Sequence, residues 1–352
     1  MADLSMQSAA DFRAVAQERL STNVWNYLVD GEGTGNEQAF ADVRLVPRPL
    51  RDLRDGHTRL ALLGEALEHP MLLAPVAYQR LFHPDGEAAS AMAASAQGGQ
   101  SVISSLASQP FPTIVEAALQ GAYRDRGSAP WFQLYWQGSR EATLRLLQRA
   151  QAAGCTTLVL TVDAPIKRAS LQLPPGIAAV NLESGQGAEV TPERVFSGLM
   201  AQAPAWADLV WLRQQWHGPL LVKGVMHPDD AEQAIAAGCD AIVVSNHGGR
   251  VLTGSALSLQ ALPAIVQRVR AHVGGGVPIV FDSGVRSGRD IFVALACGAS
   301  AVLIGRPYLW GLAANGAIGV AQVIRLLRDE LEMTMALTGC ASLDEIGPHC
   351  LA

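Results

Sequence analysis

The chain has 352 residues, of which 49% are hydrophobic and 16% charged, and its formal net charge is −6 at pH 7. This length suits two average domains or one large α/β barrel, and the apolar content suits strands that are buried on both faces. The acidic balance argues against binding to nucleic acid or to an anionic membrane, because both require a basic surface.

The pattern of the first 70 residues indicates a segment that covers the rest of the fold. Residues 1–20 are interrupted by polar and acidic side chains, which is typical of neither a signal peptide nor a membrane span. They lead into the glycine-rich turn DGEGTG (30–35) and the basic, proline-broken segment VRLVPRPLRDLRDG (43–56). No strand pattern precedes DGEGTG, so this turn is not a dinucleotide-binding fingerprint. We expect residues 1–70 to form a helical lid and a bottom cover.

From residue 71 onward, short apolar runs alternate with segments of helical spacing. Two of the helical segments, 140–154 and 227–238, end on a glycine, which is a common helix stop. Strands without a polar face that alternate with helices predict a parallel sheet, and eight such units favour one (β/α)8 TIM barrel over residues 71–345. The runs are MLLAPV (71–76), SVISS (101–105), WFQLY (131–135), TLVLTVD (157–163), PLLVKGV (219–225), AIVVSNH (241–247), PIVFDSG (278–284) and AVLIGRP (301–307).

The interval between the fourth and fifth runs is far longer than the other connections. Residues 164–218 are rich in glycine, proline and serine and have weak periodicity. We predict a mobile loop there, over the active-site face of the barrel.

The carboxyl ends of TIM-barrel strands converge on one site, so the residues that end the runs are candidate site residues. Each run from the second onward ends in a polar or charged group, and the first ends in small residues. These positions include Ala74, Ala77, Ser104, Gln133, Tyr135, Thr161, Asp163, Lys223, Ser245, His247, Arg250, Asp282, Gly284, Arg286, Gly305 and Arg306.

The last two runs pair a glycine with an arginine, Gly284 with Arg286 and Gly305 with Arg306. Bare glycine backbone lets N–H groups approach a phosphate, arginine neutralises it, and TIM barrels often bind phosphate at these strands. The alternative is that the glycines serve turns and the arginines are surface charges. The coincidence on two adjacent strands favours the phosphate site.

Lys223 ends an apolar run, where it could form a Schiff base, hold a negative charge on a cofactor ring, or extend from the rim to solvent. Tyr27 and Tyr135, considered singly, suit ordinary core positions.

His247 is the candidate general base, and Asp163 is the carboxylate best placed to orient it. The adjacent Gly248 and Gly249 are expected to clear space for a ligand. Arg250 can then bind a carboxylate with two hydrogen bonds, so the group suits proton removal from a hydroxy acid. The other histidines show no metal-ligand spacing, and the five cysteines lack C-x-x-C spacing, which favours reduced thiols in the cytoplasm and no metal site.

These motifs resemble the FMN-dependent 2-hydroxy acid oxidases and dehydrogenases, the family of glycolate oxidase, lactate oxidase and mandelate dehydrogenase. The resemblance extends from about residue 10 to 345 and rests on APVAYQRLFHPDGE, WFQLYW, LTVDAP, LVKGV, VSNHGGR, FDSGVRSGRD and LIGRP in this order. The first motif is particularly similar to hydroxymandelate oxidases.

The resemblance implies oxidation of an (S)-2-hydroxy acid to the 2-oxo acid, with His247 as base and the flavin N5 as hydride acceptor. Asp163 would orient His247, and Lys223 would stabilise negative charge on the reduced ring. The implied substrate ligands are Tyr27, Tyr135, Arg250 and Arg168, and the implied FMN ligands are Ala74, Ala77, Ser104, Gln133, Thr161, Lys223, Ser245, Asp282, Gly284, Arg286, Gly305 and Arg306.

The electron acceptor is left open between O2, giving H2O2, and another acceptor, although Ala77 matches the residue that oxidases of this family tend to carry. The segment after LTVDAP is shorter than in the family, so the place of Arg168 is ambiguous. The family tendency implies a homotetramer. Alternatives are another FMN barrel such as a type 2 isopentenyl diphosphate isomerase, a flavin-free Lys223 aldolase, and a flavin-binding protein without turnover.

Overall fold

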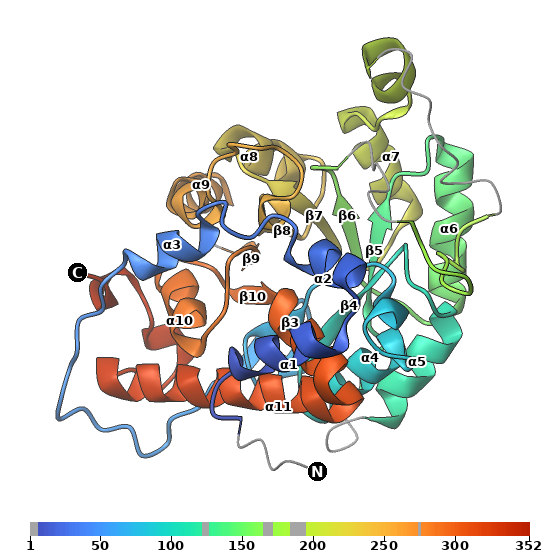
Figure 1. The fold of residues 1–352 in the computed structure, drawn as a ribbon. Helices are drawn as coiled ribbons and strands as arrows, with labels where there is room; N and C mark the ends of the chain where they lie inside the picture. The colour runs from blue at the N-terminus through green and yellow to red at the C-terminus, as the bar shows by residue number, and fades with distance from the viewer. Residues whose placement is uncertain (1–5, 122–126, 165–171, 184–194, 274–275) are drawn as a thin grey trace.

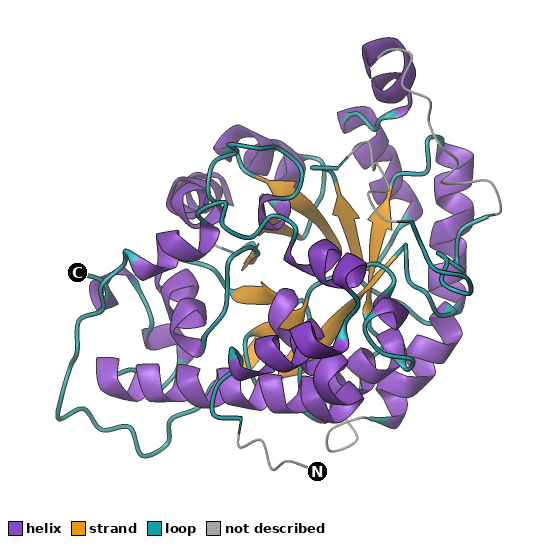
Figure 2. Ribbon diagram, viewed as in Figure 1, coloured by secondary structure: helices purple, strands orange, loops and turns teal. Residues whose placement is uncertain are grey.

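Eight parallel strands close into a barrel in the order β10-β3-β4-β5-β6-β7-β8-β9, and helices surround it (Figures 1 and 2). This computed structural model describes residues 6–121, 127–164, 172–183, 195–273 and 276–352. The predicted (β/α)8 fold is confirmed. The strands are β3 Met71–Leu73, β4 Gln100–Ser104, β5 Trp131–Tyr135, β6 Leu158–Thr161, β7 Leu220–Val225, β8 Ala241–Val244, β9 Ile279–Phe281 and β10 Ala301–Ile304.

The helices around the barrel begin where the sequence supplies caps. Ser139 accepts a hydrogen bond from the backbone N–H of Ala142 at the start of α6, and Ser287 and Asp290 form a capping box at α10. The helices are α4 Gly86–Ala96, α5 Phe111–Gln120, α6 Arg140–Ala152, α7 Trp206–Gln215, α8 Pro228–Ala236, α9 Ser258–Val273, α10 Gly288–Ala296 and α11 Arg306–Thr338.

Several strands are shorter than the predicted runs at their carboxyl ends. β8 ends at Val244 and β9 at Phe281, because the chain soon turns sharply: His247 has φ 59° and Ser283 φ 96°. Neither angle is compatible with a strand. The polar residues beyond these strands therefore lie in loops above the barrel.

A short antiparallel hairpin, β1 (Leu60–Leu62) with β2 (Glu65–Leu67), closes the opposite end of the barrel. Leu62 and Leu67 are buried in one apolar cluster with barrel residues such as Leu72 and Trp131. The Trp131 indole also donates to the Glu65 carboxylate at 2.8 Å. This hairpin lies within the segment that was expected to cover the bottom.

The prediction of one loop over residues 164–218 is wrong for its last part, where α7 forms and packs beside α6. The sequence WADLVWLRQQ has no single apolar stripe: Leu209 and Leu212 are buried, whereas Val210 between them is 45% exposed. The one-sided periodicity that reveals an amphipathic helix is therefore missing.

The α11 helix is long and apolar enough to cross a membrane by length and composition, and it is the one such helix in the described residues. However, 61% of its most apolar window is buried inside the fold. Asn315 and Gly316 also have non-helical backbone angles and divide it in two. These features are those of a core helix.

The N-terminal segment forms three short helices: α1 (Asp11–Arg19), α2 (Thr22–Val29) and α3 (Asn36–Ala41). The α1 helix packs against α11, and α3 packs against α9 (Figure 1). The turn between α2 and α3, residues 30–35, thereby reaches the carboxyl ends of the strands.

Candidate active site

The strand register brings the polar side chains of β4, β5 and β6 into one hydrogen-bonded strip. Ser104 pairs with Gln133 across β4 and β5. The Ser104 hydroxyl donates to Gln133 Oε1 at 3.2 Å, and Gln133 Nε2 donates to Thr161 Oγ1 at 3.0 Å. All three side chains are buried. The strip supplies hydroxyl and amide groups to any ring lying over the barrel mouth, as the sequence led us to expect for a flavin.

Lys223, next to Thr161 in the register, belongs to a buried ion pair. Its Nζ lies 2.9 Å from Ser245 Oγ and 2.9 Å from Asp282 Oδ2, and the Ser245 hydroxyl donates to the same Asp282 oxygen at 2.6 Å. Burial alone would raise the pKa of Asp282, but attraction by Lys223 and the Ser245 hydrogen bond lower it. The three groups form a compact charged cluster.

The charge state of Lys223 argues against the aldolase alternative. Burial alone would lower the pKa of Lys223, but Asp282 and Asp163 attract its charge and raise the pKa above the ordinary value. A Schiff-base lysine must be neutral to attack a carbonyl. Lys223 is instead a fixed cation, suited to stabilising negative charge.

His247 and Asp163 lie in contact, as the sequence predicts for a base and its orienting carboxylate. Asp163 follows β6, and its Oδ1 lies 2.9 Å from His247 Nδ1. This contact places the proton on Nδ1, so that Nε2, 3.4 Å from the Tyr135 hydroxyl, is the nitrogen that accepts a proton. Burial raises the pKa of Tyr135, which keeps its hydroxyl protonated. His247, Asp163 and Tyr135 form a triad that is suited to general-base chemistry.

The glycines beside this triad are required by packing. A Cβ on Gly224 would lie 2.6 Å from the Asp163 side chain, so a glycine there makes room for the carboxylate. A Cβ on Gly249 would overlap Thr34, and one on Gly248 would lie 3.1 Å from the Arg306 guanidinium. The expectation that the glycines clear space for a ligand is therefore wrong for Gly249, because Thr34 occupies that space; beside Gly248 lies the end of the Arg306 side chain.

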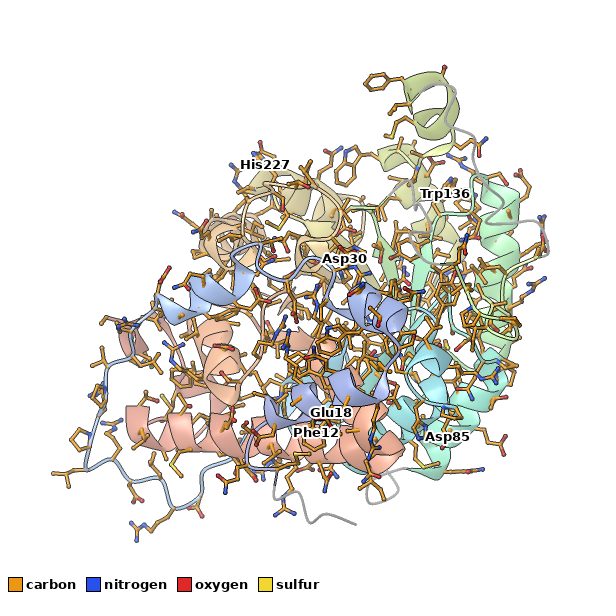
Figure 3. All side chains as sticks on the ribbon, in the orientation of Figure 1. Phe12, Glu18, Asp30, Asp85, Trp136 and His227 are labelled. Carbon is orange, nitrogen blue, oxygen red and sulfur yellow. The ribbon has the colours of Figure 1, made fainter. Side chains whose placement is uncertain are left out.

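Arg250, one turn beyond His247, lies over the ring of Tyr27 with its guanidinium carbon 4.7 Å from the ring centroid. Its Nη2 is 3.5 Å from the Asp30 carboxylate at the end of α2, which Figure 3 labels near the centre of the view. Burial raises the pKa of Tyr27, while Arg250 opposes that rise. A cation on an aromatic face with one exposed acidic partner is well placed to exchange that partner for a substrate carboxylate.

Arg286 and Arg306 form a partly buried cluster of positive charge beside this group. Burial lowers the pKa of Arg306 to about 10, and repulsion from Arg286 and Arg250 adds to the effect. Glu37 lies 2.6 Å from Arg286, and Glu32 lies 3.6 Å from Arg286 and 3.9 Å from Arg306. Cations that repel one another in this way are stabilised when a multivalent anion binds between them, and a phosphate group is such an anion.

Of the two glycines predicted to approach a phosphate, one has another explanation. Gly284 has φ 87°, and a Cβ there would lie 2.8 Å from the Asn36 carbonyl oxygen. Its missing side chain therefore admits α3. Gly305 has free space beside it, since a Cβ there would meet only Ala74 at 4.0 Å.

The segment after β3 forms a rigid wall on the remaining side. Ala74 donates its N–H to the Ile304 carbonyl at 2.8 Å and accepts from the Tyr308 hydroxyl at 2.9 Å, and Ala77 is buried. Tyr78 has φ 55° and continues this wall toward Tyr27; burial raises the pKa of Tyr78, and the nearby Tyr27 adds to the rise.

Arg168 falls outside the described residues. Trp136, which Figure 3 labels, packs edge-on against Trp211 of α7, with the two ring centroids 6.1 Å apart. Among the residues that the structure describes, no group of three His, Cys, Asp or Glu side chains is arranged to hold a metal ion.

Sequence reasoning missed two acidic partners, Glu32 in the turn after α2 and Glu37 in α3. Glu32 and Glu37 reach the arginines only because residues 30–35 lie against the loop after β8. Ser283 was also missed, although its hydroxyl accepts the Gly248 N–H at 3.0 Å. The only signal was the density of glycine in DGEGTG, which indicates close backbone approach but not its partner.

Comparison with known proteins decides the family. The profile of the family described as FMN-dependent dehydrogenase matches residues 16–352. The chain belongs to this family. It therefore uses FMN, and the resemblance deduced from the strand-end motifs is confirmed.

The relatives of this FMN-dependent enzyme share its full length. The L-lactate oxidase of Alicycliphilus denitrificans is 45% identical over 96% of this chain and 94% of its own. The 4-hydroxymandelate oxidase of Amycolatopsis orientalis is 38% identical over 96% and 95%. A solved structure of mandelate oxidase with (S)-2-phenylpropionate superposes with a TM-score of 0.85 at 37% identity, covering 99% of this chain and 98% of that one. The isomerase, the flavin-free aldolase and the flavin-binding protein without turnover are thus displaced by an FMN-dependent 2-hydroxy acid oxidase.

Proposed function

We propose that the enzyme oxidises an (S)-2-hydroxy acid to the 2-oxo acid and passes the electrons to O2. The observation that carries the proposal is the His247–Asp163 pair at 2.9 Å beside Arg250, at the mouth of the barrel that holds Lys223. The names of the relatives support the same reaction, since lactate and hydroxymandelate are both 2-hydroxy acids.

The described residues fit FMN. The buried strip Ser104–Gln133–Thr161 would bind the ring, the Lys223–Ser245–Asp282 cluster would lie at its charged edge, and Arg286 with Arg306 would hold the phosphate. The chemistry that FMN supplies when bound is acceptance of the hydride from the substrate.

The protein handles the proton and the carboxylate. His247 Nε2 takes the hydroxyl proton of the substrate, while Asp163 holds the Nδ1 proton and stabilises the imidazolium that forms. Arg250 pairs with the substrate carboxylate, over the face of Tyr27. Tyr135, protonated and 3.4 Å from His247, donates to the substrate oxygen.

One experiment tests the reaction class and the acceptor together. The purified protein, mixed anaerobically with glycolate, (S)-lactate and (S)-mandelate, should lose its visible flavin absorbance with at least one of them. Air should then restore the absorbance with formation of H2O2. No bleaching with any 2-hydroxy acid contradicts the proposal, and recovery with ferricyanide but not with air makes the enzyme a dehydrogenase.

Replacing Arg250 by alanine is expected to weaken carboxylate binding. A charge-assisted hydrogen bond contributes about 1.5–3 kcal/mol, so KM should rise about ten- to hundredfold. Steady-state kinetics with the preferred acid measure the change, and Arg268→Ala on the exposed face of α9 is the matched control. An unchanged KM and kcat in Arg250→Ala would remove Arg250 from substrate binding.

Replacing Arg306 by alanine is expected to weaken FMN binding about ten- to hundredfold, because a charge-assisted contact to the phosphate is lost. Riboflavin, which lacks the phosphate, should bind variant and parent protein alike. Flavin fluorescence titrations of the flavin-free proteins measure both affinities. Equal losses for FMN and riboflavin would show that Arg306 acts through the fold.

A homotetramer in the cytoplasm is a further part of the proposal; the family tendency supports the assembly, and the five cysteines, none of which forms a disulfide, support the compartment. Light scattering of the purified enzyme measures the assembly, and fractionation of the source cells measures the compartment.

A further inference from the structure

The turn that carries the base has an unusual backbone. Three consecutive residues, His247, Gly248 and Gly249, have φ of 59°, 66° and 78°. The left-handed region is costly for a residue with a side chain, so His247 must be held there by its surroundings. The His247 N–H donates to Ser245 Oγ at 3.0 Å, which fixes one end of the turn.

The other end is fixed by two buried amides from distant parts of the chain. Asn246 and Asn36 each donate their Nδ2 to the other's Oδ1, both at 3.1 Å. They are 6% and 3% exposed, so the two hydrogen bonds are shielded from water. Asn246 Oδ1 also accepts the Gly249 N–H at 3.2 Å and thereby spans the turn.

The partner amide is itself held rigidly. Asn36 begins α3, and its backbone lies so close to Gly284 that a Cβ there could not fit. Thr34, two residues earlier, occupies the space beside Gly249. The N-terminal segment is thus packed against the loop of the base at several points.

We propose that Asn36 is a positioning residue: its amide pair with Asn246 holds the strained turn so that His247 faces the substrate oxygen and Arg250 the carboxylate. The inference rests on the proposed role of His247 as base. In this role Asn36 acts through Asn246 and not by contact with substrate or FMN. Its effect is exerted through the geometry of the turn.

The test uses the FMN-loaded enzyme with Asn36→Ala, Asn246→Ala and the double variant. The rate of anaerobic flavin reduction, per bound flavin, should fall about ten- to hundredfold in each, because small misplacements of a catalytic group have effects of this size. Reoxidation by O2 or ferricyanide, per bound flavin, should keep its rate, because the base takes no part in it. The double variant should be no slower than the slower single one.

Asn36→Asp provides a variant of nearly unchanged volume. It places a carboxylate oxygen against Asn246 Oδ1, where the parent has an N–H donor, so it should also slow flavin reduction. The control Asn23→Ala, on the exposed face of α2, should not slow it. Lower flavin content with normal rates per bound flavin, in Asn36→Ala and Asn36→Asp alike, overturns the proposal.

His247→Ala separates the two hypotheses. Slow reduction in His247→Ala with a normal rate in the Asn36 variants rejects the positioning role and keeps the base. A normal rate in His247→Ala rejects the base itself, and with it the role of Asn36.

Discussion

Replacing His247 by alanine is expected to slow flavin reduction by a 2-hydroxy acid about 10²–10⁴-fold, the usual contribution of a general base. FMN should stay bound, because His247 belongs to neither the Ser104–Gln133–Thr161 strip nor the arginine pair. Stopped-flow absorbance under anaerobic conditions measures the rate, and the visible spectrum of the purified variant measures the bound flavin.

The matched control is His227, which caps α8 by accepting the Asp229 N–H at 3.2 Å and is labelled at the edge of the view in Figure 3. His227→Ala removes an imidazole without touching the site, so its reduction rate should equal that of the parent. A His247→Ala enzyme that reduces its flavin at the parent rate contradicts the assignment of the base.

The barrel was predictable from sequence because its strands are nearly uniform apolar runs and because helices such as α6 and α8 begin at a capping side chain and are followed closely by a glycine. The site was predictable for a topological reason: the carboxyl ends of parallel strands lie on one face of the barrel. The contact between Asp163 and His247, which are 84 residues apart, could therefore be predicted from the sequence. The strand ends themselves could not be placed, since Ser283 and His247 leave the strand conformation through their backbone angles and not through their residue type.

The contribution of the N-terminal segment could not be predicted in the same way. The contacts of Glu37 with Arg286 and of Asn36 with Asn246 join residues more than 200 positions apart through irregular backbone, which no periodicity reveals. The same packing explains why Gly249 was misinterpreted: a glycine that admits a protein segment and one that admits a ligand cannot be distinguished by sequence. The α7 helix was missed for another reason: its own tryptophan, valine and leucine residues lie on several sides of the helix and form no single apolar stripe.

Replacing Lys223 by methionine is expected to lower the free energy of unfolding at neutral pH by about 3–5 kcal/mol, because removing one partner leaves a buried charge uncompensated. Lys223 is 4% exposed, and Asp282 would keep only the Ser245 hydroxyl as a partner within the cluster. Urea unfolding of the flavin-free protein measures the change without the stabilisation that bound FMN adds. A loss of stability below about 1 kcal/mol at neutral pH would contradict the prediction that an uncompensated charge is left buried.

The pH dependence of this loss identifies its cause. In the parent protein Lys223 contributes to a lowered pKa of Asp282, so the ion pair stabilises the fold above the ordinary carboxyl pKa and this stabilisation disappears as the pH falls through the lowered value. In Lys223→Met the pKa of Asp282 should rise, because burial then acts without the cation. As the pH falls, Asp282 is therefore protonated in the variant before it is protonated in the parent. The difference in the free energy of unfolding between variant and parent should shrink in acid.

The double variant Lys223→Met/Asp282→Asn, which has neither charge, should be more stable at neutral pH than Lys223→Met alone. A loss that is independent of pH and is not reduced in the double variant would arise from packing around the lysine stem and not from the buried charge.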